Sequence, residues 1–267
     1  MSDLCLKFLE VGTGKALRRI AVRARAGSAP GLLWLSGFKS DMQGIKAQAL
    51  DRWAGEQERA AVRFDYSGHG ESGGDFKAGT VSRWLEESVT VFEVFCRGPQ
   101  IVVGSSMGGW LALLLTRELA RRSQTPASIA PASIAGLVLI APAVDFTEEL
   151  MWARFSADAK RRVEEAGFFA QPSQYSEEPY LITRALIEDG RRHLLMNSMI
   201  ETGCAVRILQ GVRDADVPWQ HAIELTARFA RDDVVLTLVK DGDHRLSRPE
   251  DIERMIAAVA EFCPQTD

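Results

Sequence analysis

Residues Gly104-Ser105-Ser106-Met107-Gly108 stand between two apolar runs, Ile101–Val103 before them and Trp110–Leu115 after them. This pattern is typical of a buried strand that turns sharply into a helix. Such a turn exposes a serine hydroxyl both to a base and to an electron-poor carbonyl carbon. Only Ser106 is flanked symmetrically by glycines, which let the strand and the helix pass closely. Ser106, rather than Ser105, is therefore the predicted nucleophile.

The pattern is short, and a chain with 22 glycines can contain it by chance. Its weight depends on whether an acid and a histidine follow it. Two loops after later apolar strands carry these residues: Gln210–Pro218 contains Asp214, and Lys240–Arg245 contains His244. The carboxyl ends of parallel strands meet at one edge of a sheet, so both loops should open beside Ser106. The order predicts a nucleophile, then an acid that orients the base, then a general base.

The choice of acid stays open between Asp214 and Asp216, which share one loop. We prefer Asp214, four residues before Pro218, and expect the other aspartate to shape the turn. Asp241 and Asp243 lie too close to His244 in sequence to orient its ring from the far side. The other histidines fit the role of base less well, because they lie in a Gly-rich loop before the serine, in an inserted region and inside a predicted helix: His69, His193 and His221.

The transition state of acyl transfer also needs hydrogen-bond donors for an oxyanion. The backbone N–H of Met107, which follows the nucleophile, is the first predicted donor. The second should come from the loop after the strand Leu32–Leu35, and we expect the N–H of Phe38. The Gly-rich stretch Asp65–Gly73 does not match a phosphate-binding loop, so its glycines are expected to shape a turn beside the site.

The bulk composition suits one large soluble domain. The chain has 267 residues, 46% of them hydrophobic, and a formal net charge of −4. A chain of this length can form a single α/β domain. No basic surface is indicated, so nucleic acid is not an expected partner.

Neither the cysteines nor the first residues indicate a special compartment. The four cysteines form no C-x-x-C pair and have no histidine at metal-ligand spacing, so reduced thiols and no metal site are expected. Met1–Lys7 lacks a basic region followed by an apolar one. The longest apolar run, Ile134–Val144, is far shorter than the ~20 residues of a membrane span. A cytoplasmic protein without a membrane span is therefore predicted.

The alternation of elements predicts the fold class. After an N-terminal hairpin, strands and helices follow one another, which favours an α/β protein with a mostly parallel, doubly wound sheet. The expected strands are Leu4–Val11, Ala16–Ala24, Leu32–Leu35, Ala61–Asp65, Ile101–Val103, Ile134–Ala141, Val206–Leu209 and Val234–Val239. The expected helices are Asp41–Gln57, Val81–Phe95, one after Ser106 that ends near Arg122, Trp219–Arg231 and Pro249–Phe262.

The alternation breaks in the middle of the chain. Residues 143–202 are rich in aromatic side chains and contain no convincing strand. We expect this segment to be a small helical cap on a core domain formed by residues 1–142 and 203–267. Its aromatic residues are Trp152, Phe155, Phe168, Phe169, Tyr175 and Tyr180. Side chains of this kind favour apolar acyl groups by burying methylenes.

Together these motifs resemble the α/β-hydrolase superfamily over nearly the whole chain. The matching segments are Ser36–Phe38, Asp65–Gly70, Gly104–Gly108, Asp214–Pro218 and Gly242–His244. Ser36-Gly37 stands where the family usually has His-Gly, a departure that leaves the backbone donor in place. The resemblance implies an α/β-hydrolase fold and a serine hydrolase.

A narrower resemblance is carried by five further stretches: Arg63–Gly68, Gly98–Trp110, Tyr175–Glu178, Val217–Trp219 and Asp243–Arg245. They are similar to the mitochondrial abhydrolase-domain acyl-glucuronide esterases and palmitoyl-protein thioesterases. This resemblance implies hydrolysis of an ester or thioester through an acyl-serine intermediate, with no cofactor. The implied substrate is a small-molecule acyl ester or thioester, with an acylated protein as a further candidate.

The fold alone does not determine the reaction. The same three residues could run acyl transfer or hydrolysis of a carbon–carbon bond. A binding protein without enzymatic activity is a further alternative, although binding alone does not require a serine supported by a base and an acid. No long apolar surface stripe demands a second subunit.

Overall fold

The computed structural model describes residues 5–123, 132–171 and 179–263. Eight strands form one sheet in the order β1-β2-β4-β3-β5-β6-β9-β10. The first two pair antiparallel, β2 pairs antiparallel with β4, and every later pairing is parallel. The strands are β1 (Leu6–Val11), β2 (Arg18–Arg25), β3 (Ser28–Leu35), β4 (Arg59–Phe64), β5 (Gly98–Ser105), β6 (Ala132–Ile140), β9 (Ala205–Gly211) and β10 (Val234–Val239).

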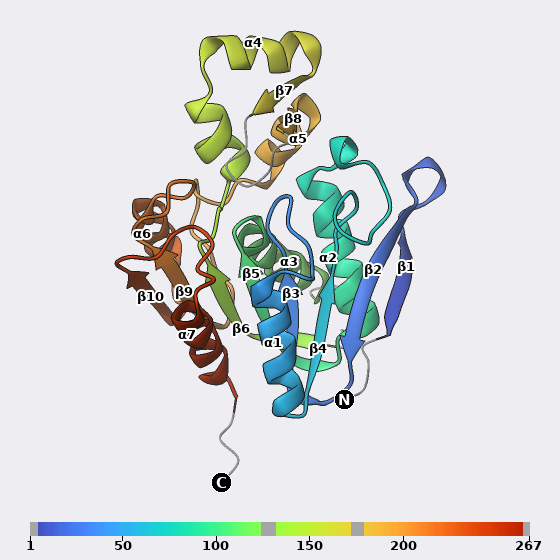
Figure 1. Cartoon of the computed structure of the whole chain (residues 1–267), viewed down its shortest axis with the longest axis vertical. Helices are drawn as coiled ribbons and strands as arrows, with labels where there is room; N and C mark the ends of the chain where they lie inside the picture. The colour runs from blue at the N-terminus through green and yellow to red at the C-terminus, as the bar shows by residue number, and fades with distance from the viewer. Residues whose placement is uncertain (1–4, 124–131, 172–178, 264–267) are drawn as a thin grey trace.

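Helices cover both faces of this sheet (Figure 1). Buried side chains of α2 (Val81–Phe95), α3 (Met107–Ser123) and α6 (Trp219–Arg228) pack on one face. Those of α1 (Ile45–Glu56) and α7 (Pro249–Ala260) pack on the other. The strands between them have apolar side chains on both faces, as expected of a sheet buried on both sides. The predicted α/β fold with a mostly parallel, doubly wound sheet is thereby confirmed.

Element boundaries differ from the sequence predictions mainly at the ends. Val81–Phe95 and Val234–Val239 coincide with their elements, whereas the helix that begins at Trp219 ends at Arg228, three residues early. Short 3₁₀ turns join several elements: η1 (Gly14–Ala16), η2 (Phe76–Ala78), η4 (Trp152–Arg154) and η5 (Arg191–His193). Within the described ranges no helix combines the length and apolarity needed to cross a membrane.

The segment 143–202 places its described residues 157–171 and 179–190 at one end of the molecule, apart from the large sheet, and returns to the core at Ile200, which forms a bridge with Phe229 (Figure 1). It contains a π-helical turn, η3 (Thr147–Met151), and the helices α4 (Ala157–Ala166) and α5 (Arg184–Gly190). The expectation that it holds no strand is wrong, because β7 (Phe168–Gln171) and β8 (Tyr180–Thr183) pair antiparallel. Each strand is only four residues long, too short for its periodicity to be distinctive. The motif Tyr175–Glu178 lies outside the described residues.

Asp145 joins the two ends of this segment. Its carboxylate accepts hydrogen bonds from the N–H of Leu195 at 2.9 Å and of Met196 at 2.8 Å, about 50 residues further along the chain. Asp145 is itself in the left-handed region, with φ of 55°, and 1% exposed. Burial raises the pKa of this carboxyl to about 6. The hydrogen bonds of Asp145 to Leu195 and Met196 thus hold the beginning and the end of this segment together; we call this contact the Asp145 clasp.

Candidate active site

The turn between β5 and α3 places Ser106 in a strained backbone conformation. Its φ is 55°, a region that residues with a side chain rarely occupy. Its N–H donates to the carbonyl of Ile140 at 2.8 Å, and its own carbonyl accepts from Gly109 at 2.9 Å and from Ala143 at 3.1 Å. The bonds to Ile140 and Ala143 attach the turn to the end of β6, and the bond from Gly109 closes the turn into α3.

The flanking glycines are required by close packing. A Cβ on Gly104 would lie 2.3 Å from the carbonyl oxygen of Gly108, and one on Gly108 would lie 2.1 Å from that of Leu35. Real Cβ contacts are essentially never under 3.0 Å. The glycine spacing noted in the sequence therefore reflects the crossing of α3 over β5 and β3.

His244 bridges the serine and an aspartate. Its Nε2 lies 3.1 Å from Ser106 Oγ, and its Nδ1 lies 2.8 Å from Asp214 Oδ2. Because a carboxylate only accepts hydrogen bonds, Nδ1 carries the proton and Nε2 presents its lone pair to the serine hydroxyl. The structure thus brings together Ser106, Asp214 and His244 from the ends of β5, β9 and β10.

Asp214 is fixed by three further donors. Its Oδ1 accepts from the N–H of Asp216 at 2.9 Å and of Val217 at 2.8 Å, and its Oδ2 accepts from Gln210 Nε2 at 3.0 Å. Of the two aspartates that the sequence left open, Asp214 is the one bonded to His244. Sequence reasoning missed Gln210, although a polar residue that ends an apolar strand was a usable signal.

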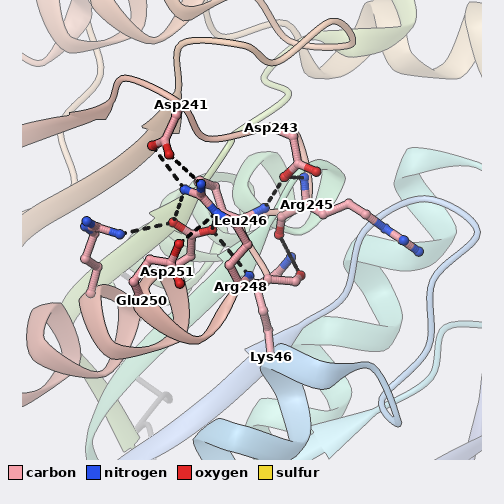
Figure 2. A network of polar contacts seen from close by, with 10 residues as sticks. Lys46, Asp241, Asp243, Arg245, Leu246, Arg248, Glu250 and Asp251 are labelled. Carbon is pink, nitrogen blue, oxygen red and sulfur yellow. Dashed lines mark hydrogen bonds and ion pairs between the residues drawn. The ribbon is translucent and has the colours of Figure 1, made fainter.

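A polar network holds the loop that carries His244 (Figure 2). Asp243 Oδ1 accepts from the N–H groups of Arg245 and Leu246 at 3.1 and 3.0 Å. On the α7 side, Arg248 donates to Asp241 at 2.7 Å and to Asp251 at 2.8 Å. The side chains of Asp241 and Asp243 therefore stabilise the loop and do not orient the imidazole ring.

Lys46 reaches the same loop from α1. Its Nζ donates to the carbonyl of Arg245, the residue after His244, and lies 3.5 Å from Ser247 Oγ. Burial lowers the pKa of this ammonium group to about 8. No sequence pattern predicts this contact, because it joins residues 199 positions apart.

The two predicted oxyanion donors line the same cavity as Ser106. Met107 is the first residue of α3, and the loop of Phe38 lies against the turn, because a Cβ on Gly37 would be 3.3 Å from Ser106 Cβ. Within the described part of the chain, neither amide donates to a loop, turn or side-chain acceptor. Both N–H groups therefore retain their hydrogen-bonding capacity beside the serine.

The cavity beside these residues has a volume of about 920 Å³. One wall comes from the strand-end loops, and the other comes from the segment 143–202. The second wall is largely apolar and includes Phe146, Leu150, Met151, Phe155, Phe169 and Tyr180. A cavity of this size and lining can hold an apolar chain.

The other three histidines have different partners. His221 Nε2 lies 3.0 Å from the carbonyl of Val144, and His193 Nε2 lies 2.7 Å from Ser82 Oγ. His69 Nε2 accepts from the N–H of Lys39 at 3.1 Å. Burial lowers the pKa of all three imidazoles. None of them is hydrogen-bonded to Ser106.

One group of potential metal ligands occurs in the described residues at this site. Side-chain atoms of Asp214, Asp216 and His244 lie within 4.8 Å of one another. Asp214 Oδ2 and His244 Nδ1 are already joined by the 2.8 Å hydrogen bond. The contact that orients the imidazole thus brings these ligand atoms together.

Comparisons with known proteins show which proteins this chain resembles. The sequence profile of the alpha/beta hydrolase family matches residues 27–261. A solved protein from Agrobacterium vitis S4 is 48% identical, with a TM-score of 0.93 over 97% of this chain and 99% of that chain. Alpha/beta hydrolase domain-containing protein 10 from mouse is 32% identical, with a TM-score of 0.83 over 97% of this chain and 98% of that chain.

A curated relative shows the same likeness by sequence. Palmitoyl-protein thioesterase ABHD10, mitochondrial, from Mus musculus is 34% identical over 244 residues, which are 91% of this chain and 78% of the relative. The narrower resemblance drawn from the motifs is therefore confirmed.

These comparisons correct the expected compartment. The prediction of a cytoplasmic protein is contradicted, because the relatives from Mus musculus, Bos taurus and Homo sapiens are all named as mitochondrial. Their names point to the mitochondrion. The first residues of a sequence do not decide the compartment, and the absence of a targeting pattern there was too weak a basis.

Proposed function

Since this chain belongs to the alpha/beta hydrolase family, we propose that it is a serine hydrolase that cleaves carboxylic esters or thioesters of apolar acyl groups. The observation that carries the proposal is the position of His244, which is hydrogen-bonded to Ser106 on one side and Asp214 on the other. Binding alone does not need this arrangement, whereas a serine nucleophile does. The thioesterase relatives support acyl substrates for this chain.

In the proposed reaction, Ser106 Oγ attacks the acyl carbonyl carbon while His244 Nε2 takes the hydroxyl proton. Asp214 holds the imidazole in the required tautomer and stabilises its positive charge. The carbonyl oxygen becomes an oxyanion, which the N–H groups of Met107 and Phe38 would bind. His244 then gives the proton to the departing alkoxide or thiolate. Water repeats these steps on the acyl-serine, releasing the acid.

The segment 143–202 is proposed to be a cap over a core domain of residues 1–142 and 203–267. Its support is the cavity wall that it contributes, with Leu150, Met151, Phe155 and Phe169 opposite the strand-end loops. Each methylene moved from water into such a wall contributes about 0.8 kcal/mol. Apolar acyl groups would therefore bind under the cap, with the ester or thioester carbonyl at Ser106.

Turnover of a substrate panel tests this function. Wild-type protein and the Ser106→Ala variant should be compared on acyl esters, acyl thioesters and acyl glucuronides of matched acyl chains. We expect hydrolysis by the wild type and a loss of at least about a thousandfold in the variant. Undiminished turnover in the variant, or none by the wild type on any acyl substrate, would contradict the proposal.

A further inference from the structure

The motif Asp65–Gly70 contacts the loop Gly37–Met42, which we call the oxyanion loop. The contact is made by His69, whose Nε2 accepts a hydrogen bond from the N–H of Lys39 at 3.1 Å. Its Nδ1 lies 3.1 Å from the carbonyl oxygen of Ser67. A carbonyl only accepts, so Nδ1 carries the proton and Nε2 is left as an acceptor. The imidazole thus links the motif to the peptide unit that follows Phe38.

This imidazole is suited to a fixed acceptor role. His69 is 5% exposed, and burial lowers its pKa to about 4. It is therefore neutral at physiological pH and keeps the lone pair on Nε2. A protonated ring would present a donor to the Lys39 N–H and could not make this bond.

The other end of the oxyanion loop is held by the same motif. Asp65 Oδ1 accepts from the N–H of Met42 at 2.6 Å, and Asp65 Oδ2 accepts from that of Glu71 at 2.8 Å. Gly70 makes room for this carboxylate, since a Cβ there would lie 2.1 Å from Asp65 Oδ2. The loop is therefore attached to one motif at two points on either side of Asp41.

The loop needs this support, because its backbone is strained. Lys39 has φ of 58°, in the left-handed region that a lysine rarely adopts. The aromatic rings of Phe38 and His69 pack against the same neighbour. Each contacts Phe76, with ring centroids 5.0 and 5.1 Å apart, respectively. Both also contact Trp84 edge to face. A change at His69 is thus transmitted directly to the residue that carries the proposed oxyanion donor.

We propose that His69 is a positioning residue for the reaction, which holds the Phe38 N–H in the direction of the oxyanion through its bond to the Lys39 N–H. This inference rests on the proposed function, since it needs an oxyanion to form at Ser106. It assigns a role to a histidine whose two ring nitrogens are both engaged with backbone groups and not with Ser106. The Asp65–Gly70 motif then serves as the scaffold of the oxyanion loop.

Two substitutions separate the hydrogen bond from the packing. His69→Phe keeps an aromatic ring against Phe76 and Trp84 but removes the acceptor. His69→Gln loses the ring but places an amide oxygen near the position of Nε2. We expect His69→Phe to lower kcat about 10- to 100-fold with KM within about threefold, because a displaced donor acts on the transition state. His69→Gln should recover kcat to within about fivefold of the wild type.

Ser72→Ala is the matched control. Its hydroxyl bonds to the carbonyl of Asp65 at 2.6 Å and accepts from the N–H of Ala21 at 2.8 Å, so it secures the same motif without touching the oxyanion loop. We expect this variant to be less stable but to keep kcat within about twofold. A kcat within twofold of the wild type for His69→Phe, or equal losses in the Phe and Gln variants, would overturn the proposal.

A measurement on the wild type covers the case in which His69→Phe does not fold. Nitrogen-15 NMR of the His69 ring should show a neutral imidazole protonated only at Nδ1 between pH 5 and 8. A proton on Nε2 would overturn the proposal. Wild-type protein without Ser106-dependent turnover would overturn both this inference and the proposed function, whereas unchanged kcat in His69→Phe with intact wild-type turnover overturns this inference alone.

Discussion

The side chain of Asp214 has both carboxylate oxygens engaged by groups that fix its direction. Two backbone N–H groups hold Oδ1, while Gln210 and His244 share Oδ2. These four hydrogen bonds keep the negatively charged carboxylate beside the imidazole ring. The orientation of His244 therefore depends on the charge of this one residue.

The Asp214→Asn variant should fold normally and lose kcat by about 10³- to 10⁴-fold. An amide cannot both accept from Nδ1–H and stabilise the imidazolium that forms when Ser106 is deprotonated. Steady-state kinetics on a soluble acyl ester measures the effect, with circular dichroism to check folding. A variant Asp216→Asn that loses more activity than Asp214→Asn would reassign the orienting acid.

At this scale the sequence was informative about chemistry and weak about loop conformation. Ser106 could be chosen because the glycines on either side are demanded by backbone contacts, which the pattern reports directly. The choice between Asp214 and Asp216 depended on how one turn folds back on itself. A pattern of residue types does not carry that information, since both aspartates suit a turn.

Among the elements, β7 shows the alternation of a half-buried strand. Phe169 lines the cavity, whereas its neighbour Phe168 is 48% exposed. Successive side chains of a strand point to opposite faces, so only one of these two rings can meet an acyl chain. Phe168 therefore serves as a control for substitutions of Phe169.

We expect Phe169→Ala to raise KM for a dodecanoyl ester about tenfold while KM for an acetyl ester changes less than about twofold. The long chain loses apolar contact with the ring, at about 0.8 kcal/mol for each methylene returned to water. Kinetics over a series of acyl lengths measures this. Phe168→Ala should leave the whole series unchanged, and equal effects of the two substitutions would contradict the proposed binding wall.

The clasp at Asp145 predicts a dependence of stability on pH. Burial raises the pKa of this carboxyl from 3.8 to about 6, which outweighs the opposing effect of its two N–H donors. Between these values the native state binds more protons than the unfolded chain, so stability falls as pH rises through this window. The maximum slope for one group is about 1.4 kcal/mol per pH unit.

The Asp145→Asn variant should lose this part of the pH dependence. The difference in free energy of unfolding between pH 4 and pH 7 should therefore change by about 2 kcal/mol relative to the wild type. Urea unfolding at both pH values, with both proteins, measures it. Identical pH profiles would show that Asp145 titrates alike in the folded and unfolded chains.

Sequence patterns predict long elements better than short ones in this chain. Long amphipathic stretches such as Val81–Phe95 were placed to the residue, because their periodicity runs over four turns. The hairpin of β7 and β8 was missed, because four residues per strand cannot establish a period. Its pairing is set by contacts within the segment 143–202, which sequence spacing does not reveal.

In the whole molecule, the residues that the proposed reaction uses lie at one edge of the large sheet. The turn with Ser106 follows β5, the proposed acid Asp214 follows β9, the proposed base His244 follows β10, and the oxyanion loop follows β3. This convergence could be predicted, since it follows from parallel strands alone. The residues that support these groups could not be predicted. Lys46 and His69 act through contacts between segments distant in the sequence, and Gln210 acts through the way one loop folds back on its strand.

If Ser106 is the nucleophile, it becomes acylated during turnover, and a trapped acyl-serine can be detected. Wild-type protein is mixed with a slowly hydrolysed acyl thioester, quenched in acid, digested, and its peptides are analysed by mass spectrometry. We expect one added acyl group on the peptide that contains Ser106, lost with time as the acid product appears, and no such adduct in the Ser106→Ala variant. Product formation without any adduct on Ser106, or an adduct that persists in the variant, would contradict it.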